Sequence, residues 1–125
     1  MWLVTTIGFF SVVQKPGAVQ LTVRARVAAD LDRLRERYLP TLSTTVANVG
    51  TDYPFRARVS RTAFSEAMAR MVGDIDYANF KNGVTKVSGK GRAGIYSGVW
   101  TQLLALEQSE PDEAAKRIKQ TASKP

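Results

Sequence analysis

The chain contains no cysteine and no histidine. Without cysteine it can form no disulfide, thiolate zinc site, iron–sulfur cluster or cysteine nucleophile, so nothing in it indicates an oxidising compartment. Histidine is the usual general base near neutral pH and the commonest metal ligand. Because the sequence has no histidine, it cannot carry out serine–histidine hydrolysis, cysteine–histidine proteolysis or histidine-ligated metal chemistry.

The sequence also lacks an apolar run long enough to cross a membrane. Residues 2–13 are mostly apolar, but they carry no basic leader or small-residue cleavage site and fall short of the ~20 residues that a membrane span needs. We interpret this run as a buried strand. We therefore expect a cytoplasmic protein with no membrane partner.

Acidic residues are few: 11 stand against 18 lysines and arginines, which gives a formal charge of +7 and a pI near 10.1. Such a balance favours an anionic partner, either nucleic acid or an acidic protein.

At 125 residues the chain has room for one hydrophobic core. The composition points to no catalytic residue, cofactor or metal, and it leaves the oligomeric state open.

The residue pattern predicts an α+β fold. Strands are expected at residues 2–14, 21–27, 44–49 and 53–60, and helices at 30–38 and 60–73, with Ser60 as a helix cap. The sequence Arg-Ala-Arg-Val occurs at 24–27 and again at 56–59, each time before a helix. We therefore expect a four-stranded, mostly antiparallel sheet built from two strand-strand-helix units.

Additional C-terminal helices are expected at residues 80–87 and 92–108, separated by a loop at 88–91. The second of these is apolar over more than one stripe, so it should be largely buried. Residues 1–108 then form a single domain. The segment 109–125 has almost no large apolar residue and is expected to be a flexible or weakly helical tail.

The first candidate site consists of arginines from two strands. Alternation places them on one sheet face if the strands share a sheet and a matching register. The four residues are Arg24, Arg26, Arg56 and Arg58. Four guanidiniums would make a phosphate-binding surface. The alternative is the ordinary solvated face of an antiparallel sheet, and we expect this face to lack the interleaved aromatic residues on which bases stack.

The second candidate is a basic stretch without acidic residues, which includes two glycines that would let an anion approach the backbone. Its cations are Lys81, Lys86, Lys90 and Arg92. The glycine and hydroxyl positions of a phosphate-binding loop are not met. The segment is therefore either a loose anion site or a solvated loop.

The third candidate is a cluster of polar residues in loops. It comprises Asp52, Tyr53, Asp74, Asp76 and Tyr77, with Glu66 as a neighbour. Paired carboxylates can bind magnesium or share a proton. Aspartates after a glycine more commonly cap helices and form turns, and Asp76 is placed to cap the following helix.

Several short stretches together resemble a family of small uncharacterised bacterial proteins, a domain of unknown function. They are residues 2–5 (WLVT), 8–11 (GFFS), 15–16 (KP), 21–26 (LTVRAR), 50–53 (GTDY), 74–77 (DIDY), 79–81 (NFK), Tyr96, and 99–100 (VW). The resemblance spans residues 2 to about 107 and carries no activity or site residue with it. It implies a bacterial, non-secreted protein.

Three hypotheses for the function follow. The first is a non-enzymatic basic module that binds nucleic acid or an acidic protein. The second is an enzyme that acts on a phosphorylated small molecule, with magnesium held by Asp52, Asp74 or Asp76 and with arginines as anion clamps. The third is a protein-interaction or oligomerisation module with an apolar patch around Trp100 or Phe9.

Overall fold

The computed structural model describes residues 1–109 and 113–122, and its contacts divide the chain into two compact units, Met1–Ala93 and Gly94–Pro125. The first unit holds an antiparallel sheet, the helices α1 (Ala28–Arg37), α2 (Arg61–Gly73) and α3 (Phe80–Ser88), and the start of α4 (Lys90–Leu103). The second holds the rest of α4 together with α5 (Leu106–Ser109) and α6 (Glu113–Ala122). The predicted α+β class is confirmed.

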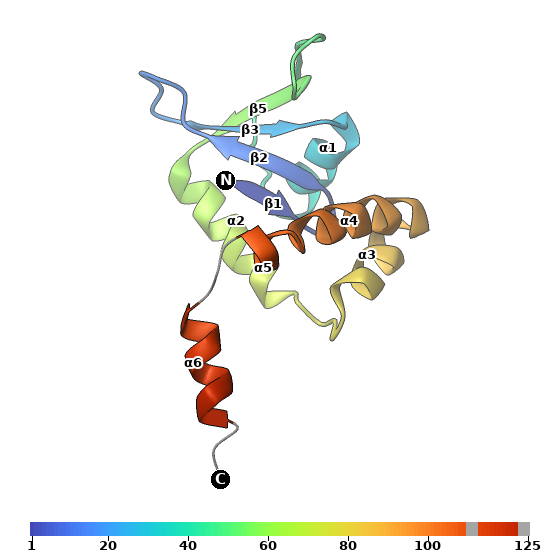
Figure 1. The fold of residues 1–125 in the computed structure, drawn as a ribbon. Coiled ribbons are helices and arrows are strands. Elements are labelled where there is room, and N and C mark those ends of the chain that lie inside the picture. The colour runs from blue at the N-terminus through green and yellow to red at the C-terminus, as the bar shows by residue number, and fades with distance from the viewer. Residues whose placement is uncertain (110–112, 123–125) are drawn as a thin grey trace. The chain divides into compact units, whose positions relative to one another are not determined.

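The sheet has five strands rather than the predicted four, in the order β1-β2-β3-β5-β4, and each neighbouring pair is antiparallel. The strands are β1 (Trp2–Val4), β2 (Phe9–Val13), β3 (Leu21–Ala25), β4 (Val46–Ala47) and β5 (Phe55–Val59). Figure 1 shows β1, β2, β3 and β5 side by side. The fourth pairing is short, because only two of the six residues predicted as a strand at 44–49 join the sheet.

The extra strand arises because residues 2–14 form a hairpin and not one strand. Thr5 closes its turn: the hydroxyl donates to the carbonyl oxygen of Gly8 at 2.7 Å and accepts from the Gly8 amide at 3.1 Å. Gly8 is required there, since a Cβ atom on it would lie 2.7 Å from Asp30 Cγ. This turn splits the predicted strand into β1 and β2.

One face of the sheet carries the hydrophobic core. Phe10, Val23 and Ala57 point to this side, where Leu31 and Leu34 of α1 and residues of α2 pack in the same buried cluster. The helix α2 begins as predicted, because the Ser60 hydroxyl accepts a hydrogen bond from the Ala63 amide at 3.1 Å. The other face of the sheet holds the arginines.

The C-terminal segments differ from the prediction. The predicted loop at 88–91 is reduced to Gly89 between α3 and α4, and its φ of 91° is readily adopted only by glycine. The helix predicted at 92–108 is not largely buried, since Ile95, Trp100 and Leu103 are 69%, 66% and 56% exposed. Within the predicted tail, α6 forms a regular helix, while residues 110–112 and 123–125 lie outside the described residues.

No helix among the described residues combines the length and the apolar character that spanning a membrane requires.

Candidate functional site

The register of the sheet places all four arginines on one face. Arg24 of β3 lies directly opposite Arg56 of β5, and Arg58 lies opposite Thr22. Because side chains alternate along a strand, Arg26, two residues beyond Arg24, projects to the same side as Arg24. We call this surface the arginine face and define it by Arg24, Arg26, Arg56 and Arg58.

Tyr53 holds the arginine side chains in place. The Cζ atoms of Arg24 and Arg26 lie 4.6 Å and 5.1 Å from the centre of its ring, within the range of cation–π attraction. Its carbonyl oxygen accepts a hydrogen bond from Arg56 Nε at 3.2 Å, and Arg24 Nη2 donates to Ser11 Oγ at 2.7 Å. Tyr53 itself is only 6% exposed. It therefore organises the arginine face from beneath.

The positive charge of the arginine face is not compensated within the described residues. None of its four guanidiniums forms an ion pair with a carboxylate there. Arg24 and Arg56 are directly opposed, an arrangement of like charges that costs stability. In addition, Arg24 Nε is buried and has no hydrogen-bond partner. An anion on this face would relieve the repulsion.

Aromatic residues accompany the arginines, contrary to the prediction. Trp2 of β1 lies opposite Ser11, which lies opposite Arg24, so the three share one row across the sheet. Trp2 is 70% exposed, and its ring stands edge-on to Phe9 at 5.9 Å between centroids. Phe9 in turn lies 6.3 Å from Tyr53. The aromatics were missed because residues 2–14 were taken as one strand covered on both faces.

The basic stretch of the second candidate is helical except at Gly89, so its predicted loop at 88–91 does not form. Lys81 and Lys86 belong to α3, while Lys90 and Arg92 lie in the first turn of α4. Arg92 is bound to Asp30, with Nη1 and Nη2 at 2.8 Å and 3.0 Å from its two carboxylate oxygens. These four cations therefore do not form one anion-binding site in the structure.

Asp30, which sequence reasoning missed, is the centre of a buried network. It is 2% exposed, and its carboxylate accepts from Arg92, from Arg33 Nη2 at 2.5 Å and from the Phe9 amide at 3.0 Å. Arg33 also donates to the carbonyl oxygen of Ile7 at 2.8 Å. The network joins the β1–β2 turn, α1 and the start of α4. It thereby ties together segments that lie far apart in the sequence.

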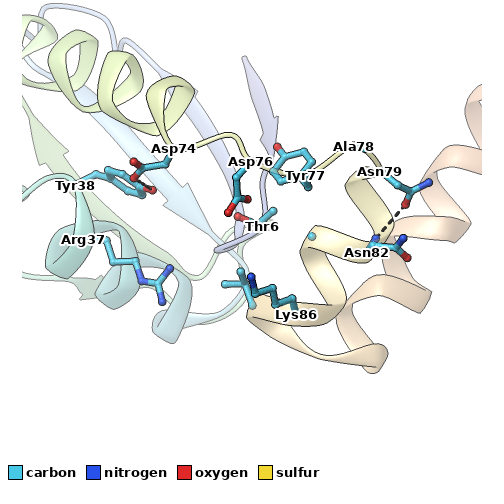
Figure 2. A pocket seen from close by; sticks show the side chains of 12 residues that line it. Thr6, Arg37, Tyr38, Asp74, Asp76, Tyr77, Ala78, Asn79, Asn82 and Lys86 are labelled. Carbon is cyan, nitrogen blue, oxygen red and sulfur yellow. Dashed lines mark hydrogen bonds between the residues drawn. The ribbon is translucent and has the colours of Figure 1, made fainter.

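The polar loop cluster is divided between two places. Asp74, Asp76 and Tyr77 line one cavity of about 550 Å³ (Figure 2), whereas Asp52 and Tyr53 precede β5 and do not line it. Asp76 does not cap the next helix as expected, because Asn79 accepts from the Asn82 amide instead. Among residues 1–109 and 113–122, no three carboxylates lie close enough together to hold a metal ion.

Asp74 has a partner in the cavity wall. The hydroxyl of Tyr38 donates to Asp74 Oδ2 at 2.7 Å. Burial raises the pKa of the Tyr38 phenol above its usual value, and the neighbouring carboxylate raises it further because ionised tyrosine would repel it.

Of the two residues expected to centre an apolar patch, Phe9 is half-buried, whereas Trp100, in the second unit, is exposed.

Comparison of the chain with protein-family models, with curated proteins and with solved structures finds no match. Function must therefore be inferred from the arrangement of the chain's own residues.

Proposed function

We propose that the arginine face binds single-stranded nucleic acid. The observation that carries the proposal is one row of the sheet in which an exposed aromatic ring, Trp2, is followed by Ser11 and then by the opposed pair Arg24 and Arg56. Proteins that bind single strands combine cations that follow the phosphates with aromatic rings on which bases stack. Both components are present on this face.

The phosphate contacts are assigned to the guanidiniums. Arg26 and Arg58 are exposed, and Arg24 and Arg56 are half-buried with their stems packed on the sheet. Arginine binds phosphate oxygens through two parallel hydrogen bonds and always carries its charge. Because these four cations have no ion pair to break among the described residues, phosphate binding does not compete with an internal carboxylate.

The base contact is assigned to Trp2. Trp2 is 70% exposed, so its ring can stack on an unpaired base, whereas Tyr53 is covered by arginines and cannot. Bases in a duplex are already stacked and paired, so a stacking contact favours a single strand. Removal of one stacking residue costs about 1–3 kcal/mol per base, which raises Kd about 5-fold to 150-fold.

The test is a fluorescence-anisotropy titration of oligo-dT and oligo-U of about twelve nucleotides. If each of the four guanidiniums neutralises one phosphate, log K should fall with log salt with a slope of about −2.8, or about 50-fold between about 50 and 200 mM. The variant Arg26→Gln/Arg58→Gln should reduce the slope to about −1.4 and the loss to about 7-fold. Trp2→Ala should weaken single-strand binding about tenfold.

The matched control is Arg37→Gln/Lys81→Gln, which removes the same charge from helices α1 and α3 and should leave the slope unchanged. An equal slope in both double variants would show that only net charge matters and would overturn the proposal. So would polyglutamate binding as tightly as oligo-dT, which would indicate an acidic protein partner instead. Absence of binding at low salt would leave the face without a nucleic-acid role.

A further inference from the structure

A polar cavity lies in the first unit, away from the residues that define the arginine face. Four segments line it: the β1–β2 turn with Thr6, the end of α1, the segment from the end of α2 to α3, and α3 itself (Figure 2). Its volume of about 550 Å³ falls within the range of small-molecule sites.

Charges of opposite sign meet across this cavity without pairing. Asp76 points into it from the segment between α2 and α3, and Arg37 and Lys86 reach toward the same space from α1 and α3 (Figure 2). No ion pair joins Asp76 to either cation among the residues that the structure describes. A ligand that carries both charges could satisfy both sides at once.

The wall near Asp76 is partly fixed in position. Asp74 is held by the Tyr38 hydroxyl through Oδ2, which leaves its other oxygen free to accept. Tyr77 is pressed against Gly83, where a Cβ atom would lie 2.9 Å from the Tyr77 ring. Gly83 therefore lets the Tyr77 ring pack closely against α3. Both aspartates line the cavity: Asp74 lies beside Tyr38, and Asp76 points toward Thr6 (Figure 2).

We propose that the cavity binds a small dipolar molecule with an ammonium and a carboxylate group, that is, a free amino acid. The ammonium lies against Asp76 and the open oxygen of Asp74, and the carboxylate lies between Arg37 and Lys86. A simple anion would leave the aspartates unpaired, and a simple cation would leave Arg37 and Lys86 unpaired. The proposal does not depend on the nucleic-acid function of the arginine face.

The test is a titration of the ¹⁵N-labelled chain with individual L-amino acids, β-alanine and γ-aminobutyrate, followed by amide chemical shifts. At least one ligand should shift the amides of residues 74–86 and saturate with a Kd of about 1 mM or below. The N-acetyl and carboxamide analogues of that ligand, which lack one charge each, should bind at least about tenfold more weakly. Asp76→Asn and Lys86→Met should each raise Kd by a similar factor.

The control variants are Asp52→Asn and Lys15→Met, which remove the same charges outside the cavity and should leave Kd unchanged. Asp76 and Lys86 are exposed, so their variants should keep the circular dichroism spectrum and melting temperature of the parent. Three results would overturn the proposal: no saturable shift at about 10 mM ligand, equal binding of the neutralised analogues, or an unchanged Kd in Asp76→Asn and Lys86→Met.

Discussion

Removal of the Asp30 carboxylate should destabilise the first unit severely. The variant Asp30→Ala removes the carboxylate that accepts hydrogen bonds from the Arg92 guanidinium, whose side chain is 18% exposed, and from the Phe9 amide. Deleting one partner of a buried ion pair costs about 3–5 kcal/mol. Arg33, whose side chain is 33% exposed, can regain part of its hydration. We therefore expect a loss of about 4 kcal/mol, a large share of the 5–15 kcal/mol typical of a domain.

The assay is urea unfolding followed by circular dichroism, with the slope m unchanged and the midpoint lowered. Asp32→Ala is the matched control, because it removes the same charge from the same helix. Its partner is Arg35 at 3.2 Å and its side chain is 66% exposed, so the loss should stay below about 1 kcal/mol. Arg92→Met combined with Asp30→Ala should cost less than the sum of the two single changes. Equal losses for Asp30→Ala and Asp32→Ala would refute the importance of the network.

Two further predictions concern close contacts. Gly8→Ala should lower the free energy of unfolding by about 1–3 kcal/mol, because the added Cβ would clash with Asp30. The control is Gly73→Ala, whose added Cβ would meet no atom within 4 Å. In thermal melts this variant should be as stable as the parent or more stable. The second prediction concerns the Tyr38 phenol, whose pKa is raised in the folded state. Its protonated form therefore stabilises the fold. This contribution is fully present below the unfolded pKa of about 10 and is lost as the pH rises through the higher folded pKa. Absorbance titration should give Tyr38 a midpoint above the usual value of about 10, and Asp74→Asn should lower that midpoint; an unchanged midpoint would contradict the assigned cause.

Features encoded by adjacent residues could be predicted from the sequence. Ser60 and the apolar spacing after it predicted α2 correctly, because a cap and a stripe are both local signals. The alternation around Arg24 and Arg56 likewise showed which residues share a strand face. What the sequence could not provide was the pairing of β3 with β5, which alone makes Arg24 and Arg56 neighbours.

The failures came from turns and from contacts between distant residues. Thr5 closes a turn through its hydroxyl, but as a β-branched residue it was taken as part of a strand. That error concealed the position of Trp2 on the arginine face. The pairing of Asp30 with Arg92 has no sequence signature, because 62 residues separate them. The aspartates after Gly73 and Lys86 were candidates from the sequence, but in two separate sites, and Arg37 was not a candidate. Nothing in the sequence showed that these residues line one cavity.

The Asp30 network also sets an order of events during synthesis. The hairpin β1–β2, the strand β3 and the helix α1 all leave the ribosome before Arg92, which lies 62 residues beyond Asp30. Until then, Arg33 is the one of these two cationic partners that the Asp30 carboxylate can pair with. The network that joins the β1–β2 turn, α1 and α4 is therefore complete only once the first turn of α4 has been made.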